Sequence, residues 1–298
     1  EYPNPFAAME DAMRLAQGMS YKNAMAGLPL GGGKSVIIKT NKQSNRQQLF
    51  KVFGRFVEEL NGRYITAVDS GTTPEDMNMI ATGTGFVTST TRAGNGDPSP
   101  FTATGVRLAM EAAVKFKYNR NSMEGLHVAI QGVGKVGTYL AKELHERGVR
   151  LTVTDSNPDH IRYCVEKFNA KPIGLEEILS VPCDIFSPCA LGAIINDDTI
   201  PLIKANIIVG CANNQLSEPR HGIMLAHKDI LYGPDYVVNA GGVIHAASQY
   251  LKIPLEVVCQ KVDKIYDTTL DIFKRASIEN LPTSQVADAI ALEKINQR

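Results

Sequence analysis

Two lysines and an aspartate beside glycine-rich segments are the first candidates for chemistry in this sequence. Lys22 follows a tyrosine, Lys34 follows three glycines, and Asp69 stands at the end of a short apolar run. In one closed site, a charged Lys22 can anchor a carboxylate. A desolvated Lys34 has its pKa lowered towards neutrality and can serve as an acid or base. Asp69 can exchange protons with an amine, although lysines and turn aspartates are most often simply solvated.

The segment Gly31–Ser35 also contains part of a phosphate-binding P-loop pattern. That pattern requires a glycine at position 28, where the sequence has Leu28, and a preceding strand, where the spacing predicts a helix. We therefore do not expect a nucleoside triphosphatase.

A second glycine-rich turn follows a predicted strand and opens a predicted helix. The turn consists of Gly132, Val133, Gly134, Lys135, Val136 and Gly137. Its glycines permit a tight turn and close approach to a pyrophosphate, and the helix N-terminus offers N–H groups to the phosphates. Asp155, which ends the next strand, can bind ribose hydroxyls and repels a 2′-phosphate, so the pattern favours NAD over NADP. An ordinary strand-to-helix turn is the alternative.

Periodic apolar residues predict the elements that position these groups. Helical spacing predicts helices over 7–18, 47–60 and 255–277, the first ending at Gly18, with Thr283 as the N-cap of a last helix. Strands are predicted at 35–38, 64–67, 126–131, 150–154, 183–186 and 206–209. Their alternation with helices in the middle of the chain predicts a parallel, doubly wound sheet. The segment 83–100, rich in Gly, Thr, Ser and Pro, predicts a long loop between domains.

Composition narrows the class of protein. The 298 residues are 44% apolar and 21% charged, which excludes wholesale disorder, and 31 basic residues balance 31 acidic ones. That balance argues against nucleic acid or an anionic membrane as the main partner. The five cysteines form no CxxC pair, so we expect no metal site and no disulfide scaffold, and reduced thiols fit a cytoplasmic location.

Taken together, these residues resemble the amino-acid dehydrogenase superfamily (Glu/Leu/Phe/Val dehydrogenases), in the branch of leucine, valine and phenylalanine dehydrogenases. The matching blocks run in the family's order over almost the whole chain, at 18–23, 27–34, 61–67, 69, 71–73, 100–103, 132–137, 187–192, 212–215 and 234–244. The family has a further segment before position 1, so we expect this chain to be N-terminally incomplete.

The resemblance implies an α/β protein of two domains with the active site in the cleft between them. A mixed α/β catalytic and substrate-binding domain is expected over 1–100, and a Rossmann-type, doubly wound NAD-binding domain over 101–270. C-terminal helices over 271–298 are expected to return to the catalytic domain. The implied reaction is the reversible NAD-dependent oxidative deamination of an L-amino acid to a 2-oxo acid, ammonia and NADH. A homo-oligomer is expected, with neither nucleic acid nor membrane as partner.

The resemblance also implies roles for individual residues. Lys22 matches the lysine that binds the substrate carboxylate, Lys34 the catalytic lysine, and Asp69 the proton-shuttling aspartate. Neutral Lys34 would activate a water, and the charge of Lys22 would help to hold the pKa of Lys34 down. Further expected contacts are Gly31 and Asn239 with the substrate, and Thr104, Cys189, Ala190, Ala212, Asn213 and Asn239 with the cofactor.

The matching blocks also bear on the substrate. Beyond Lys22 and Lys34 they contain no cation for a side-chain carboxylate, which favours leucine, valine or isoleucine over glutamate. Ala67 and Val262 are the predicted pocket walls, although the helical spacing of Val262 also fits a core position. Val68 stands where the family commonly has an acid, which makes the neighbouring wall more apolar.

Three alternatives stay open. Pocket volume decides between the branched-chain substrates and a phenylalanine- or tryptophan-type dehydrogenase, and one sequence does not give it. A hydroxy-acid dehydrogenase on a similar fold would place a histidine in the glycine-rich motifs, where none of the six histidines stands. A non-catalytic NAD-binding or interaction protein is the alternative of another class.

Overall fold

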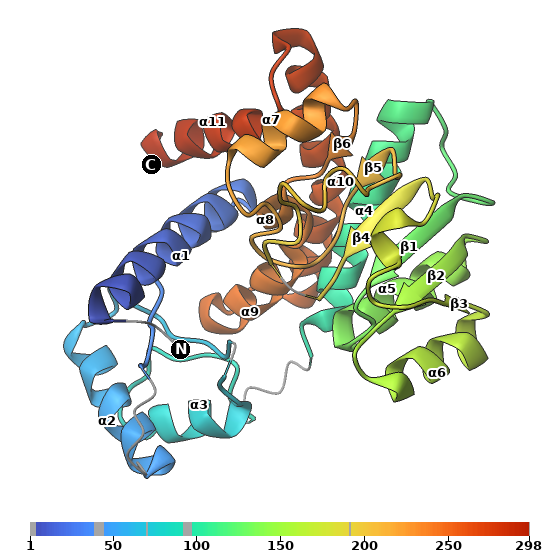
Figure 1. Ribbon diagram of the computed structural model, residues 1–298. Coiled ribbons are helices and arrows are strands. Elements are labelled where there is room, and N and C mark those ends of the chain that lie inside the picture. Colours follow the sequence, from blue (N-terminus) through green and yellow to red (C-terminus); the bar gives the residue numbers. More distant parts are fainter. Residues whose placement is uncertain (1–3, 39–44, 70, 92–96, 191, 298) are drawn as a thin grey trace. The chain divides into compact units, whose positions relative to one another are not determined.

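The computed structural model describes residues 4–38, 45–69, 71–91, 97–190 and 192–297, and its elements are labelled in Figure 1. The chain forms two compact units. The first combines Glu1–Asp97 with Val243–Val258, and the second combines Pro98–Gly242 with Cys259–Arg298. In the part of the chain that is described, no helix is long and apolar enough to cross a membrane.

The second unit contains a six-stranded parallel sheet, which confirms the predicted doubly wound fold. Its strands are β1 (His127–Gln131), β2 (Arg150–Thr154), β3 (Lys171–Pro172), β4 (Ile185–Pro188), β5 (Ile207–Ile208) and β6 (Leu231–Tyr232). They lie in the order β3-β2-β1-β4-β5-β6, as Figure 1 shows. In such a sheet the strand order reverses between β1 and β4, and ligands bind outside the carboxyl ends of the strands at that point.

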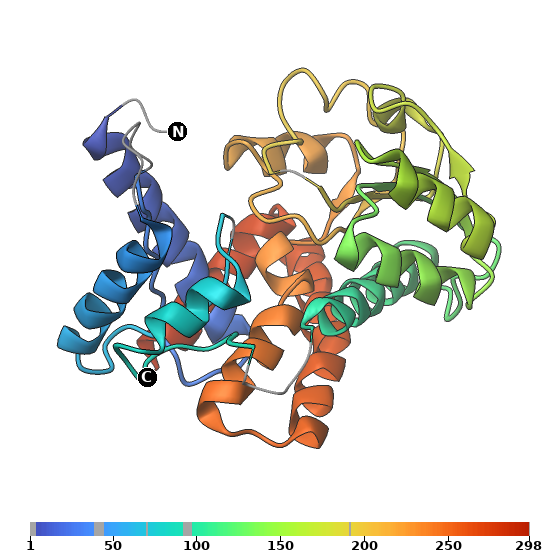
Figure 2. The ribbon, with the colours of Figure 1, turned by 90° about the horizontal axis from the view of Figure 1, so that it is seen from below.

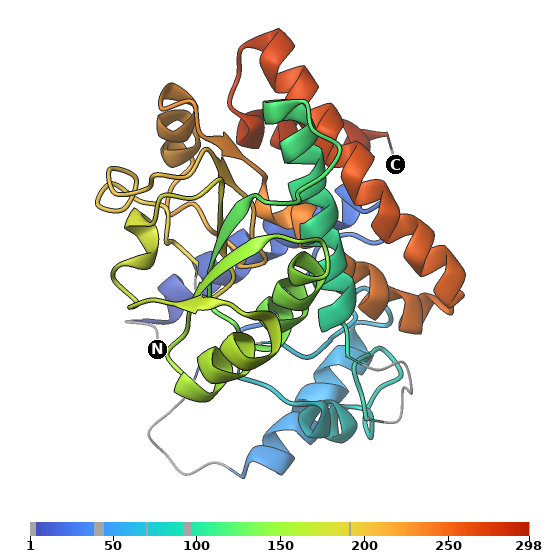
Figure 3. The same cartoon turned by 90° about the vertical axis from the view of Figure 1, so that its right-hand side faces the viewer.

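Helices cover this sheet and pack with one another. They are α4 (Ser99–Tyr118), α5 (Lys135–His145), α6 (Pro158–Phe168), α7 (Arg220–His227), α8 (Asp235–Val238), α10 (Leu255–Glu279) and α11 (Thr283–Asn296), with a 3-10 turn at Ile178–Ser180. Figure 3 shows α4 running beside α10, where the rings of Phe116 and Phe273 lie 5.7 Å apart. Central β1 is apolar without alternation, since Val128, Ala129 and Ile130 are all fully buried.

The first unit is helical, and the two strands predicted for it are wrong. It contains α1 (Pro5–Met25), α2 (Arg46–Glu59), α3 (Pro74–Ile80) and most of α9 (Gly241–Leu251). Among the described residues, 35–38 pair with no other segment, and the segment 64–67 forms only an isolated bridge between Thr66 and Val87. An extended segment becomes a strand only through a pairing partner, which local sequence does not reveal. Figure 2 shows α2 and α3 side by side, joined by Phe50, Met77 and Ile80.

Helix α1 continues past Gly18, where the sequence predicts its end. It stops instead at Gly27, whose φ of +62° belongs to the left-handed region. There the Leu28 N–H donates to the Asn23 carbonyl at 2.9 Å and the Gly27 N–H to the Ala24 carbonyl at 3.1 Å. This is a Schellman cap, completed by the full burial of Leu28.

The C-terminal segment differs from the prediction in two ways. Helix α11 begins with Thr283 itself, so this residue is not the N-cap, and its hydroxyl donates to the Tyr232 carbonyl at 2.6 Å. The segment 271–298 lies within the second compact unit, where α11 contacts α7 and β6. The compact units therefore differ from the predicted domains here and at 243–258.

The two glycines of α1 give opposite expectations for stability. Gly27→Ala should destabilise the protein by about 1–2 kcal/mol, because an alanine at this φ is strained. Gly18→Ala should stabilise it by roughly 0.5–1 kcal/mol, because a Cβ there meets no atom within 4 Å and the helix loses a flexible residue. Urea unfolding followed by circular dichroism measures both, and equal effects of the two variants would contradict the cap.

Candidate active site

Lys34 and Asp69 form an ion pair, which is the juxtaposition that the sequence predicts. The lysine side chain is 24% exposed, whereas that of the aspartate is 52% exposed. Burial of the ammonium group lowers the pKa of Lys34, and the carboxylate of Asp11 opposes this by raising it. The sequence predicts this lowering by desolvation, and burial is its largest cause.

The glycines before Lys34 fix its backbone against α1. The Asn23 amide donates to the Gly31 carbonyl at 2.5 Å, and a Cβ at Gly32 would overlap Ser20 of the same helix. On the other side, a Cβ at Gly33 would lie 2.7 Å from the Tyr64 ring. These contacts explain Gly32 and Gly33 without a P-loop, whereas a Cβ at Gly31 would meet no atom within 4 Å.

Asp69 is held by a turn that the sequence does not single out. Its N–H donates to the Thr72 hydroxyl at 2.8 Å, and that hydroxyl donates to the Asp69 carbonyl at 2.7 Å. Arg46 of α2 then secures the turn, since it donates to the Gly71 carbonyl at 2.8 Å and pairs with buried Asp76 at 2.6 Å. The Arg46 hydrogen bond also lowers the pKa of Asp76.

Asp11 and Lys22 lie on one face of α1, because eleven residues are close to three full turns. The half-buried Lys22 thus lies on the same helix face as Asp11, whose carboxylate raises the pKa of Lys34. Sequence reasoning missed Asp11, although this spacing could have indicated it once the helix was extended to Met25.

The two predicted pocket walls lie in different compact units. Ala67 is exposed and follows Thr66, whose carbonyl accepts from the Thr88 N–H at 2.9 Å. The Thr88 hydroxyl in turn donates to Gln249 of α9 at 2.9 Å, so Ala67 is tied to this helix. Val262, by contrast, is 2% exposed on α10. Its role as a pocket wall stays a prediction.

In the second unit, each glycine of the turn after β1 meets a different constraint. Gly132 has φ +95°, and a Cβ there would lie 2.7 Å from that of Ala190. A Cβ at Gly137 would overlap the Gly132 carbonyl, whereas one at Gly134 meets nothing within 4 Å. Gly132 and Gly137 are thus required by packing, and Gly134 leaves space for a ligand beside the start of α5.

The Asp155 carboxylate is fixed beside this turn. It accepts from the Val133 N–H at 2.8 Å and from the Asn157 N–H at 2.8 Å, and its side chain is 11% exposed. The Val133 N–H already donates to Asp155, so a phosphate at this turn would be bound by the N–H groups at the start of α5. There, Lys135 is exposed and Val136 is half-buried.

Asn239 joins the segments that follow β5 and β6. Its amide donates to the Cys211 carbonyl at 3.0 Å and to the Asn213 side-chain oxygen at 2.8 Å. The residue is 5% exposed, yet its Oδ1 has no hydrogen-bond partner among the residues that the structure describes. A buried acceptor without a donor is costly, so this oxygen fits a donor from a ligand.

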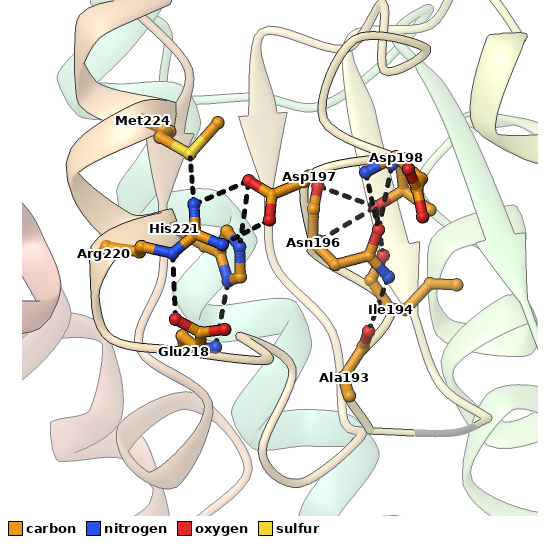
Figure 4. A network of polar contacts seen from close by, with 10 residues as sticks. Ala193, Ile194, Asn196, Asp197, Asp198, Glu218, Arg220, His221 and Met224 are labelled. Carbon is orange, nitrogen blue, oxygen red and sulfur yellow. Dashed lines mark hydrogen bonds and ion pairs between the residues drawn. The ribbon is translucent and has the colours of Figure 1, made fainter.

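The loops after β4 and β5 run side by side. The Ala193 N–H donates to the Asn214 carbonyl at 2.6 Å, and Ile195 forms a bridge with Leu216. Figure 4 shows Arg220 of α7 closing this pair of loops through Asp197 and Glu218, a network that sequence reasoning missed. The predicted cofactor residues Cys189, Ala190, Ala212 and Asn213 lie at the base of these loops.

Thr104 binds a side chain of α5, and its role beside the cofactor stays a prediction. Its hydroxyl donates at 2.8 Å to Glu143 of α5, which also pairs with Arg107 at 2.6 Å. Thr102, two positions before Thr104, lies against Gly242. A Cβ added at Gly242 would come within 2.6 Å of the Thr102 hydroxyl. Thr102, in the matched block 100–103, is therefore the threonine beside the segment that carries Asn239.

Comparison with known proteins follows the same division of the chain. The family model described as "Glu/Leu/Phe/Val dehydrogenase, dimerisation domain" matches residues 4–85. The model "Glutamate/Leucine/Phenylalanine/Valine dehydrogenase" matches residues 94–159 and 151–297.

Individual relatives match over nearly the whole chain. Leucine dehydrogenase of Geobacillus stearothermophilus is 49% identical over 99% of this chain and 81% of its own length. Phenylalanine dehydrogenase of Thermoactinomyces intermedius is 42% identical over 99% of this chain and 82% of its own. The crystal structure of L-tryptophan dehydrogenase from Nostoc punctiforme is similar with a TM-score of 0.88 and 43% identity, covering 99% of this chain and 85% of that one.

Proposed function

The chain belongs to the glutamate/leucine/phenylalanine/valine dehydrogenase family, and from this premise we propose that it is an NAD-dependent dehydrogenase of apolar L-amino acids. The reaction is the reversible oxidative deamination of the amino acid to a 2-oxo acid and ammonia, with leucine, valine or isoleucine as substrate. The observation that carries the proposal is the half-buried Lys34, with its lowered pKa, paired with Asp69.

The second unit fits a dinucleotide. Open space at Gly134, the fixed Asp155 carboxylate and the unpartnered Asn239 oxygen are three features that an ordinary strand-to-helix turn does not need. Gly134 and the start of α5 would hold the pyrophosphate and Asp155 the adenosine ribose, with Thr102 and Asn239 on the nicotinamide side. Bound NAD supplies the hydride acceptor of the reaction.

The residues of the first unit would perform the remaining chemistry. Lys22, which stays cationic, would bind the substrate carboxylate and so fix the α-carbon. Once the α-carbon has lost its hydride, the substrate is an iminium that water can attack. Neutral Lys34 would take a proton from this water as it attacks, and Asp69 would move protons to and from the nitrogen until ammonia leaves. Burial favours the neutral lysine that this step requires.

The walls beside Ala67 suit an apolar side chain. Val68 packs against the core between α2 and α3, whereas α9, to which this segment is tied, has Val243 and Ala246 half-buried on its first turns. Names of the relatives support the same class, since they act on leucine, phenylalanine and tryptophan. A phenylalanine- or tryptophan-type specificity is therefore the second candidate, and differences of one methylene are worth only about 1–3 kcal/mol.

We further propose that the protein is a homo-oligomer. Phe6, Met9 and Met13 of α1 are 80%, 60% and 66% exposed and form one apolar stripe at helical spacing. Such a stripe is typical of a helix that packs against a partner. A cytoplasmic location stays a prediction.

Activity with Lys34→Ala tests the proposed function. Purified protein with NAD and L-leucine should form NADH, and the variant should lose about 10²–10⁴-fold in kcat, which is what a general base contributes. The matched control is Lys51→Ala, which removes an exposed lysine of α2. Absence of turnover with a panel of L-amino acids would favour a non-catalytic protein, and turnover that survives in Lys34→Ala would exclude this lysine as the base.

The pH dependence follows from the environment of Lys34. Because the base must be neutral, kcat/KM for deamination should rise with pH and level off below the ordinary lysine pKa of 10.5. Asp11→Asn removes a carboxylate that raises this pKa, so the inflection should move to lower pH. Glu10→Gln on the same helix is the control, and a shift to higher pH would contradict the proposal.

Cofactor choice tests the role of Asp155. Asp155→Asn keeps the shape of the side chain but removes the charge that repels a 2′-phosphate, so the ratio of kcat/KM for NADP to that for NAD should rise about tenfold or more. Asp159→Asn, which neutralises an exposed carboxylate on α6, should leave the ratio unchanged. An unchanged ratio in Asp155→Asn would place the ribose elsewhere.

A further inference from the structure

Two of the five cysteines lie together at the carboxyl edge of the sheet. Cys189 directly follows β4 and Cys211 follows its parallel neighbour β5, in which Ile208 pairs with Phe186. Beyond the strands, the Ala212 N–H donates to the Pro188 carbonyl at 3.0 Å, so the two segments stay paired up to the cysteines. The Cys211 thiol lies 3.7 Å from the Cys189 carbonyl oxygen, and both residues are half-exposed.

The surroundings of Cys189 differ from those of Cys164 and Cys183. Its sulfur lies 3.3 Å from the Ser187 hydroxyl, and hydrogen bonds from Cys211 lower the pKa of Cys189. Burial instead raises the pKa of Cys164 to about 11 and that of Cys183 to about 12. Since the thiolate is the reactive form, the lowered pKa favours Cys189 over Cys164 and Cys183 as the reactive thiol, and Cys211 is its neighbour.

The same two residues touch the predicted dinucleotide site. Ala190, next to Cys189, packs against Gly132 of the glycine-rich turn. The Cys211 carbonyl accepts from the Asn239 amide at 3.0 Å. A disulfide fixes its Cβ atoms about 3.5–4.5 Å apart, so closing one here would constrain both loop bases and the two contacts that they make.

We propose that Cys189 and Cys211 form a redox-sensitive dithiol, which hydrogen peroxide converts to a disulfide that weakens dinucleotide binding. The dithiol follows from the strand geometry alone, whereas its effect on NADH rests on the proposed function. NADH held at the glycine-rich turn would lie near Gly132 and Ala190 and should therefore slow the oxidation.

The oxidation proceeds in two balanced steps. The Cys189 thiolate attacks one peroxide oxygen, the O–O bond breaks, and the products are a sulfenic acid and hydroxide, which takes a proton to become water. The Cys211 sulfur then attacks the sulfenyl sulfur, the S–S bond forms, and the S–O bond breaks to release a second water with the Cys211 proton. Two thiols are thus oxidised by two electrons while one peroxide is reduced, and an added dithiol reverses the change.

The test treats reduced protein with hydrogen peroxide and follows intact mass, peptide mapping without reductant and NADH fluorescence titration. We expect loss of two hydrogen atoms, a link between the peptides of Cys189 and Cys211, and a Kd for NADH raised about tenfold or more and restored by dithiothreitol. Cys211→Ala should form no link and should leave a sulfenic acid on Cys189 that dimedone traps. Cys259→Ala, which removes an exposed cysteine of α10, should form the link normally.

Other outcomes of this test would overturn the dithiol, its coupling to the cofactor site or the proposed function. A link to a different cysteine, or no link at all in NADH-free protein, overturns the dithiol. A 189–211 link that leaves the NADH Kd unchanged overturns the coupling to the cofactor site. Reduced protein that forms the link but never binds NADH refutes the proposed function and leaves the dithiol intact.

Discussion

The chemistry of this protein depends on the partial removal of one ammonium group from water. Lys34 is only 24% exposed, and the resulting lowering of its pKa brings the neutral base within reach. Two carboxylates oppose this: Asp69 pairs with the charged form, and Asp11 raises the pKa from α1. The site is therefore balanced between a charged lysine that holds Asp69 and the neutral lysine that the proposed function requires. The glycines that press the Lys34 backbone against α1 and Tyr64 maintain this balance, because they fix how deeply the side chain is buried.

The second unit shows how a parallel sheet gathers polar groups. The carboxyl ends of β1, β2, β4 and β5 meet at one edge, and the turns after them carry Gly134, Asp155, Ala190 and Ala212. Each turn is stabilised by its own hydrogen bonds, of which that from Val133 to Asp155 links two strands directly. Among the described residues, Gly134 leaves open space at this edge, and buried side-chain oxygens of Gln131, Thr154, Gln215 and Asn239 have no hydrogen-bond partner. Unused acceptors of this kind are what a bound ligand with hydrogen-bond donors would satisfy.

The same edge explains why a reactive thiol pair lies beside a cofactor site. Neighbouring parallel strands bring residues distant in sequence to within bonding reach, and the extra hydrogen bonds that hold the loops together also hold Cys189 next to Cys211. Arg220 and the bridge between Ile195 and Leu216 tie the far ends of these loops. Movement at the thiols is therefore directed towards Gly132 and Asn239, because the other end of each loop is anchored.

The sequence by itself determined what local patterns encode. The doubly wound sheet, the glycine-rich turn and Asp155 were predictable, because periodicity and glycine spacing report on nearby residues. Lys34 and Asp69 are 35 residues apart, and only the ordered blocks shared with the family brought them together. Tertiary structure decided what depends on distant partners. Residues 35–38 form no strand because none of the described residues pairs with them, and α1 passes Gly18 to a cap at Gly27 that is completed by the buried Leu28. Thr102 rather than Thr104 lies by Gly242, and Asn23, Arg46 and Asp11 hold or tune the site, through contacts between segments that no local pattern records.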